Sequence, residues 1–199
     1  MKKLLVLGGT SGFGLALARV SVPYYFVTVT GRRGISEPAI NSIILDSANL
    51  DVRWLRAHDP DIVVNNAYDK KDHRASFSNS LIAVREPLKF FKEKGGGIIV
   101  NVNSIAGLQP DTKDPDYAAS KQGLRGYVDS ISHNAYLSGI NIINLYPRAV
   151  ATGLSEGRED FSKLIDPIEL ANFCLLLLRT ESFYISTIVF DRVFSFSGE

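Results

Sequence analysis

A phenol and an ammonium group lie four residues apart in the segment DPDYAASKQGLRG, which runs from Asp114 to Gly126. If this segment is helical, Tyr117 and Lys121 project from the same face, because residues i and i+4 share a face of an α-helix. A tyrosine ordinarily ionises near pH ~10, and a nearby cation favours the phenolate. The pair could therefore move a proton near neutral pH, although a solvated helix with one aromatic residue and one lysine would give the same pattern.

A glycine-rich loop follows the first apolar run of the chain, in the segment VLGGTSGFG. Gly8, Gly12 and Gly14 have G-x3-G-x-G spacing, which permits a tight turn and a close approach of the backbone to phosphates. The N-terminus of a following helix would add unpaired N–H groups and a positive dipole end. Between a strand and a helix, such a loop favours dinucleotide binding over a purely structural turn.

The segment VTVTGRR, about 20 residues beyond the start of this loop, bears on the choice of cofactor. Dinucleotide folds that bind NAD carry an acidic residue at the end of the second strand, where it contacts the ribose 2′-hydroxyl. Here Arg32 and Arg33 stand in its place, and a guanidinium group suits the 2′-phosphate of NADP. We therefore predict NADP(H) over NAD(H), with Arg32 as the main contact; the alternative is that both arginines are solvated loop charges.

Strand-like and helix-like patterns alternate along the chain. Short apolar runs that predict strands lie at 3–7, 25–30, 43–45, 61–67, 97–102, 140–145 and 184–190. Patterns that predict helices lie at 13–20, 79–92, 116–137 and 167–178. Apolar strands that alternate with helices are typical of a parallel sheet covered on both faces. The sequence therefore predicts an α/β fold, a doubly wound Rossmann-type parallel sheet of about seven strands, as a single domain over residues 1–199.

The composition excludes several classes of protein. The chain has 199 residues and a net charge of +1, so no global field favours nucleic acid or an anionic membrane. The single cysteine, Cys174, excludes an internal disulfide and is expected to be buried within FCLLLLR. No apolar run reaches the ~18 residues of a membrane-spanning helix, and the run in MKKLLVLGG is too short for a signal peptide. We expect a cytoplasmic protein that binds no nucleic acid and no membrane.

Four motifs in their order along the chain resemble the short-chain dehydrogenase/reductase family. They are the glycine loop, NNA after the fourth strand, a serine after the fifth strand, and YAASK in the next helix. The resemblance implies an oxidoreductase acting on a small alcohol or carbonyl, with Tyr117 as general acid or base. It implies that Lys121 lowers the pKa of this tyrosine and holds the nicotinamide ribose, and that Ser104 hydrogen-bonds the substrate carbonyl. Hydride transfer to a carbonyl builds charge on oxygen, which needs a hydrogen-bond donor and a proton source in one place.

The resemblance also implies further site residues. Asn79 is the candidate for the asparagine of the family's proton relay, although it could instead cap a helix. Ser104 could likewise be an ordinary hydroxyl that caps a loop. Asp46, after the third strand, is expected to face the adenine. No metal site is predicted. The implied cofactor contacts are Gly8, Thr10, Ser11, Gly12, Phe13, Gly14, Arg32, Arg33, Asp46, Ser47, Asn66, Ala67, Tyr117, Lys121, Pro147, Val150 and Thr152.

The chain departs from the family pattern at several points. Tyr68 replaces the glycine of NNAG, and Arg148 replaces the glycine of the Pro-Gly pair after the sixth strand. With Leu154 and Phe161, these residues are candidates to line a substrate pocket, which they could reshape or block. Only residues 31–42 join the second and third strands, which leaves hardly any room for a crossover helix.

These departures leave open a second function, a catalytically inactive dinucleotide-binding regulatory protein of the same fold. A sugar-nucleotide epimerase or dehydratase is the third alternative, but 199 residues cannot supply its additional substrate domain. A homodimer or homotetramer is also expected, because the helices at 79–92 and 116–137 carry apolar residues on more than one face. These residues include Phe90, Phe91, Leu124, Tyr127 and Ile131.

Overall fold

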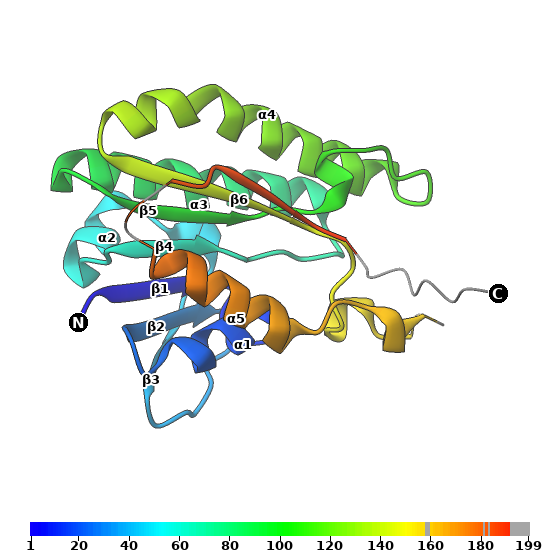
Figure 1. Ribbon diagram of the computed structural model, residues 1–199, viewed down its shortest axis with the longest axis horizontal. Helices are drawn as coiled ribbons and strands as arrows, with labels where there is room; N and C mark the ends of the chain where they lie inside the picture. Colours follow the sequence, from blue (N-terminus) through cyan, green and yellow to red (C-terminus); the bar gives the residue numbers. More distant parts are fainter. Residues whose placement is uncertain (158–159, 181, 183, 192–199) are drawn as a thin grey trace.

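The computed structural model describes residues 1–157, 160–180, 182 and 184–191. Parallel strands form one seven-stranded sheet in the order β3-β2-β1-β4-β5-β6-β7 (Figure 1). The strand order reverses between β1 and β4, and ligands of open α/β sheets bind at the carboxyl ends of strands beside such a switch point. The strands are β1 (Lys3–Leu7), β2 (Phe26–Gly31), β3 (Ile40–Ile44), β4 (Ile62–Asn65), β5 (Gly97–Val102), β6 (Ile140–Pro147) and β7 (Thr187–Phe190).

Helices cover both faces of the sheet, as Figure 1 shows. The helices α1 and α5 pack together on one face, and α2, α3 and α4 lie on the other. This arrangement confirms the predicted doubly wound α/β fold. The α-helices of the described residues are α1 (Gly12–Ser21), α2 (Val52–His58), α3 (His73–Lys94), α4 (Pro115–Leu137) and α5 (Pro167–Leu178).

The strands are apolar along their length because both of their faces are buried. Along β1, Leu4 and Val6 pack into the core beneath α1 and α5. The alternate residues Leu5 and Leu7 pack into the second core, beneath α3 and α4. Successive side chains of a strand point to opposite faces, so a parallel sheet between two helical layers requires this continuous apolar run.

Several predicted elements need correction; the seventh strand, for example, begins at Thr187 rather than at residue 184. The third strand begins earlier than expected, at Ile40. The helix before the fifth strand begins at His73 rather than Asn79, because Asp72 caps it. The short helix α2 was not predicted; only Leu55 of it is buried, so it has almost no apolar stripe for a periodicity argument to detect.

The crossover between β2 and β3 contains no helix, as its length predicted. An isolated antiparallel bridge between Glu37 and Ile40 turns the chain directly into β3. This edge of the sheet is accordingly thinly covered, and Ile44 at the end of β3 is 72% exposed.

The apolar residues expected on the outer faces of α3 and α4 lie mostly inside the core. Phe90, Phe91 and Leu124 are at most 4% exposed, so they cover the sheet and cannot contact a second subunit. Tyr127 and Ile131 are only partly buried against the same core. The observation that motivated a homodimer or homotetramer is therefore weaker than the sequence indicated, and association stays a prediction.

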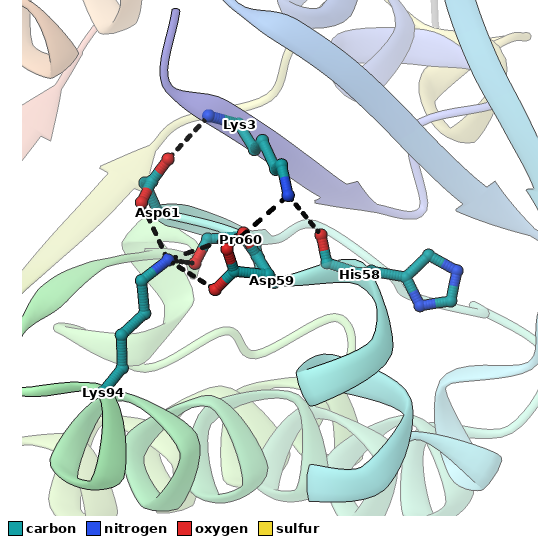
Figure 2. Close-up of polar contacts among 6 residues, drawn as sticks. All are labelled: Lys3, His58, Asp59, Pro60, Asp61 and Lys94. Atoms are coloured by element: carbon teal, nitrogen blue, oxygen red, sulfur yellow. Dashed lines mark hydrogen bonds and ion pairs between the residues drawn. The ribbon is translucent and has the colours of Figure 1, made fainter.

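A cluster of ion pairs, shown in Figure 2, holds the amino edge of the sheet together. Lys94 Nζ, at the end of α3, lies 2.8 Å from carboxylate oxygens of both Asp59 and Asp61. The backbone N–H of Lys3 in β1 donates to Asp61 at 2.8 Å, and its Nζ lies 3.5 Å from Asp59. Burial opposes the charge of Lys94, but its bonds to Asp59 and Asp61 outweigh burial and raise the pKa of Lys94. Every charge of this cluster thus has an opposite partner.

Cys174 is buried in α5 at 2% exposure, as expected. Burial raises the pKa of its thiol to about 12, so it is a structural residue rather than a nucleophile. Within the described part of the chain, no helix combines the length and the apolar character needed to cross a membrane.

Candidate active site

The glycine loop lies at the carboxyl edge of the sheet, where it packs closely against the end of β4. Gly8 has a φ of +72°, and a Cβ atom there would come within 2.7 Å of Ala67. The side chain of Asn66 donates a hydrogen bond of 2.9 Å to the carbonyl oxygen of Gly8. A Cβ atom at Gly14 would come within 2.4 Å of the same oxygen. The packing therefore requires both glycines, and it brings four of the predicted cofactor residues together.

The N-terminus of α1 differs from those of the other α-helices in the described chain. An aspartate caps each of α2, α3, α4 and α5, and its side chain accepts a hydrogen bond from a backbone N–H group. Ser11, at the N-cap of α1, makes no such bond, and the first turn of α1 has no acidic residue. The unpaired N–H groups and the positive dipole end therefore stay available to an anion. This end of α1 fits the diphosphate of a dinucleotide.

Other predicted cofactor residues surround this loop. Gly12 has a φ of +53°, and a Cβ atom there would lie 3.3 Å from the side chain of Thr152, so the segment after β6 reaches back to the loop. The side chain of Thr10 packs over Gly31 at the end of β2. Phe13 is 6% exposed and belongs to the core, so only its backbone can reach a ligand.

Tyr117 and Lys121 lie one turn apart on α4, as their spacing predicted. Asp114 caps this helix by accepting a hydrogen bond of 2.9 Å from the backbone N–H of Tyr117. Lys121 is 5% exposed, and its Nζ lies 5.7 Å from the centre of the Tyr117 ring. Burial of the ammonium group lowers the pKa of Lys121 to about 8. A buried lysine of this kind can lose or keep its proton near physiological pH.

The pKa of Tyr117 is raised in this structure, and the prediction that Lys121 lowers it stays a prediction. Burial raises the pKa of Tyr117, a hydrogen bond with Ser104 opposes the rise, and the carboxylates of Asp111 and Asp114 add to it. Lys121 is not among the groups that set the pKa of Tyr117, and its Nζ lies 5.7 Å from the centre of the tyrosine ring. A phenol with a raised pKa keeps its proton and is suited to donate it as a general acid.

Ser104 has the capping role that the sequence left open, and its hydrogen bond to a substrate carbonyl stays a prediction. It is the N-cap of the short helix η2 (Ile105–Gly107), and its Oγ accepts a hydrogen bond of 3.2 Å from Ala106 N. The Ser104 side chain also acts on Tyr117, because it opposes the rise in the pKa of that phenol. A donor and a proton source therefore meet at one point, as reduction of a carbonyl requires.

Asn103 fixes the strand that carries Ser104 to the helix that carries Tyr117. Its Nδ2 donates a hydrogen bond of 3.1 Å to the backbone oxygen of Lys121. Its Oδ1 accepts one of 3.0 Å from the backbone N–H of Ser104. Asn103 is 5% exposed, so both bonds are shielded from water. It is a positioning residue that the sequence analysis missed.

Three buried asparagines extend across the sheet behind this site. Asn65 of β4, Asn101 of β5 and Asn144 of β6 are neighbours in register. Asn65 Nδ2 donates to Asn101 Oδ1, and Asn101 Nδ2 donates to Asn144 Oδ1, each at 3.0 Å. These bonds join three neighbouring strands near the edge that carries the site, although the buried Oδ1 of Asn65 has no hydrogen-bond partner among the described residues.

Asn79 does not cap a helix. It lies inside α3, whose N-cap is Asp72, and its side chain is half-buried. Its side chain forms no hydrogen bond with another described residue, whereas the backbone oxygen of the neighbouring Ser80 accepts one of 3.4 Å from Asn65. The structure does not link Asn79 to Tyr117 or Lys121, and its part in a proton relay stays a prediction.

Arg32, the predicted phosphate contact, is paired with an acidic residue. Its NH1 atom lies 2.6 Å from Asp69 Oδ2, and 68% of its side chain is exposed. Because Arg32 follows β2 and Asp69 follows β4, this pair spans the end of β1, which lies between them in the sheet. Arg33 is exposed and has no ion-pair partner among the described residues. Asp46 caps the short helix η1 (Ser47–Asn49), whose first residue is the predicted contact Ser47.

The segment after β6 forms the wall of a cavity of about 460 Å³. Pro147 ends β6, and Val150 forms a parallel bridge with Ile165. Arg148 pairs with Asp191 beyond β7, which ties it to the edge of the sheet. The predicted pocket residue Phe161 lines the cavity but Leu154 does not. The lining residues are Ala151, Thr152, Gly153, Glu156, Gly157 and Phe161.

Tyr68 lies directly against the candidate catalytic pair. Lys121 Nζ is 4.2 Å from the centre of the Tyr68 ring, and the Tyr117 ring meets it edge-on with centres 5.4 Å apart. The Tyr68 hydroxyl is hydrogen-bonded to His73 Nδ1, and His73 Nε2 lies 3.2 Å from Asp114 Oδ2. Burial raises the pKa of Tyr68 well above its ordinary value, so this phenol stays protonated.

Comparison with known proteins identifies the family. The family model described as short chain dehydrogenase matches residues 61–162, about half of the chain. That range contains NNA, Ser104, Tyr117 and Lys121. The chain belongs to the short-chain dehydrogenase family, as the motifs predicted, and with it to a class of dinucleotide-dependent oxidoreductases.

Three similar proteins illustrate this membership. A 3-alpha-(or 20-beta)-hydroxysteroid dehydrogenase of Mycobacterium bovis is 27% identical, over 92% of this chain and 84% of its own. A 15-hydroxyprostaglandin dehydrogenase [NAD(+)] of Rattus norvegicus is 34% identical, over 61% of this chain and 57% of its own. The structure of ElxO with NADP bound has a TM-score of 0.80 at 20% identity, over 96% of this chain and 98% of that one, which supports the fold alone.

Three residues of the site were missed by the sequence analysis. The asparagines of NVNS were a usable signal for Asn103, because polar residues in a buried strand need partners. His73 and Asp69 carried no such signal, since their contacts with Tyr68, Asp114 and Arg32 depend on how separate segments pack.

Proposed function

We propose that the protein is an NADP(H)-dependent oxidoreductase that transfers a hydride between nicotinamide and a small alcohol or carbonyl compound. Tyr117 holds the proton that is given to the carbonyl oxygen or taken from the alcohol. Ser104 donates a hydrogen bond to the same oxygen, and Lys121 contributes positive charge beside Tyr117. A bound nicotinamide would supply or accept the hydride.

One observation carries this proposal. Ser104 and Tyr117 come from different elements, yet the Ser104 side chain is near enough to oppose the rise in the pKa of Tyr117, one helical turn from the buried Lys121. A protein that only binds a dinucleotide has no need for a donor, a proton source and a buried cation at one point. The same edge of the sheet carries the glycine loop and the uncapped N-terminus of α1, which suit a dinucleotide.

The preference for NADP(H) rests on the end of β2. The residues directly after Gly31 are Arg32 and Arg33, and neither carries a carboxylate. The relatives include an enzyme named for NAD(+) and a structure with NADP, so they favour neither cofactor. In our proposal the 2′-phosphate replaces Asp69 as the partner of Arg32, which is possible because most of the arginine side chain is exposed.

The test is a panel of aldehydes, ketones and their alcohols, with NADPH oxidation or NADP⁺ reduction followed by absorbance. We expect turnover of at least one compound by the wild type and turnover lower by orders of magnitude for Tyr117→Phe. Cofactor binding is measured in parallel by fluorescence. Binding of NADPH without turnover of any compound would contradict the proposal.

Tyr68 favours a second candidate, a catalytically inactive dinucleotide-binding protein of the same fold. Its ring covers Lys121 at 4.2 Å, in front of the group that an active enzyme would present to its cofactor. Under this alternative, Tyr68→Gly would leave the protein inactive with every compound of the panel.

A further inference from the structure

Tyr68 stands where the family motif NNAG has glycine, and its contacts are those of a fixed part of the site. The face of its ring lies 4.2 Å from Lys121 Nζ, closer than the Tyr117 ring at 5.7 Å. The edge-on contact with Tyr117 gives it a second neighbour within the site. A glycine at this position would leave the space in front of Lys121 empty.

A chain of polar contacts holds the ring in this orientation. The Tyr68 hydroxyl bonds His73 Nδ1, and His73 Nε2 contacts Asp114 Oδ2 at 3.2 Å. An imidazole whose Nε2–H donates to the carboxylate leaves Nδ1 as the acceptor for the phenol. The other oxygen of Asp114 caps α4 through Tyr117 N. One carboxylate therefore begins the helix that carries Lys121 and orients the ring that covers it.

In this arrangement the Tyr68 hydroxyl is bonded to His73, so the part of Tyr68 that can act on Lys121 is its ring. With its hydroxyl directed at His73 and its pKa raised by burial, Tyr68 is not a second acid for the substrate. Lys121, by contrast, has no carboxylate partner among the described residues. The ring faces of Tyr68 and Tyr117 are the groups that its ammonium contacts.

We propose that Tyr68 is a positioning residue that acts through Lys121: its ring, held by His73 and Asp114, closes the front of the lysine and keeps its ammonium group beside Tyr117. This inference rests on the proposed function for its consequence in catalysis. The effect of Tyr68 on Lys121 itself does not depend on the proposed function, because it is present in the protein without cofactor or substrate.

The ring acts on Lys121 in two opposite ways. By excluding water it disfavours the charged form, and burial is the cause that lowers the pKa of Lys121. By presenting its π-face it favours the charged form through a cation–π interaction. The titratable groups around the pair are Tyr117 of α4, Asp114 at the N-cap of that helix, His73 of α3, and the loop residues Asp69 and Asp111. A glycine removes both effects, whereas a leucine of similar bulk removes only the second.

The test is the titration of the Lys121 side chain by NMR in cofactor-free protein labelled at lysine, with Lys121→Arg used to assign the resonance. For Tyr68→Gly we expect the midpoint to rise by about one pH unit or more, because water reaches the ammonium group. For Tyr68→Leu we expect a fall of about 0.5 unit or more, since water stays excluded while the cation–π contact is lost. Tyr68→Phe keeps the ring and should stay within about 0.4 unit of the wild type.

Unchanged midpoints in both the glycine and the leucine variants would overturn the inference, as would shifts of the same sign in both. If Tyr68→Gly does not fold, the downward shift in Tyr68→Leu and its rescue in Tyr68→Phe still decide the matter. Activity is measured in parallel as the pH profile of kcat/KM for each variant. The alkaline limb of this profile should shift in the same direction as the titration midpoint of Lys121. Midpoints that shift as expected in a protein that turns over no substrate would refute the proposed function and leave the control of Lys121 by Tyr68 intact.

Discussion

Each edge of the sheet has a lysine with a shifted pKa, and the two shifts have opposite directions. At the amino edge, Lys94 bonds Asp59 and Asp61, and these partners raise its pKa in spite of burial (Figure 2). At the carboxyl edge, Lys121 is more deeply buried and faces the ring of Tyr68 instead of a carboxylate, and its pKa falls to about 8. Both lysines lie on long helices that cover the same face of the sheet. The position of each lysine on its helix therefore does not explain the difference between their pKa values. The side chains that surround each ammonium group explain it.

This difference separates a charge that stabilises the fold from a charge that we propose to serve chemistry. A lysine with carboxylate partners contributes to stability and cannot change its protonation near neutral pH. A buried lysine without such partners costs stability, because desolvation of its charge is not offset. We therefore expect substitutions at the carboxyl edge to reduce function while stability is kept or raised, and substitutions at the amino edge to do the reverse.

The largest expected effect is that of Tyr117→Phe on turnover. The variant keeps the ring that meets Tyr68 and loses only the transferable proton, so turnover should fall about 10²–10⁴-fold. NADPH affinity and the free energy of unfolding should be nearly unchanged, as measured by fluorescence titration and urea denaturation. More than half of the wild-type activity on a true substrate would rule out the role given to Tyr117.

Arg32→Ala tests the charge at the carboxyl edge that is proposed to bind cofactor. Loss of charge-assisted bonds to the 2′-phosphate, worth roughly 1.5–3 kcal/mol, should weaken NADPH binding about 10–100-fold. NADH binding should change far less, and titration of both cofactors measures the difference.

The matched control for this experiment is Asp69→Asn, which frees Arg32 without removing it. Exposed ion pairs are weak, so NADPH binding should tighten by less than about fivefold. Tighter binding of NADH than of NADPH by the wild type would contradict the cofactor proposal as a whole.

Lys121→Met should abolish function and yet stabilise the protein at neutral pH, by about 1–3 kcal/mol. The folded-state pKa, about 8, lies below the ordinary value of 10.5. Below pH 8 Lys121 is protonated in both the folded and the unfolded protein, and the folded protein bears the cost of desolvating its charge. Between pH 8 and pH 10.5 the unfolded protein binds more protons than the folded protein, so the stability of the wild type rises with pH. The advantage of the variant should therefore shrink between about pH 8 and pH 10.5 in urea denaturation. A destabilised variant at pH 7 would refute this account of Lys121.

Lys94→Met is the counterpart at the amino edge and has the smallest expected effect. It leaves Asp59 and Asp61 with Lys3 alone, so the free energy of unfolding should fall by about 1 kcal/mol while turnover is kept. Urea denaturation and a standard activity assay measure both. A gain in stability here, like that expected for Lys121→Met, would mean that the two edges do not differ as described.

The sequence by itself determined the fold and the list of candidate catalytic side chains. Alternating apolar runs require a covered parallel sheet, and the parallel strands bring the glycine loop and Ser104 to one edge. Tyr117 and Lys121 share a face because helical spacing is a local property of the chain. Each of these inferences depends on neighbours in sequence or on the fixed direction of a strand, and such features can be deduced without coordinates.

Only the tertiary structure decided how those side chains behave. The pKa of Tyr117 is raised rather than lowered because burial outweighs its neighbours, and burial depends on the packing of distant segments. The cover that Tyr68 places over Lys121 requires three segments to meet, at Tyr68, His73 and Asp114. The pairing of Arg32 with Asp69 likewise joins residues that follow different strands. Solvent exposure and long-range pairing are properties of the assembled fold, so no local pattern of residues could have specified them.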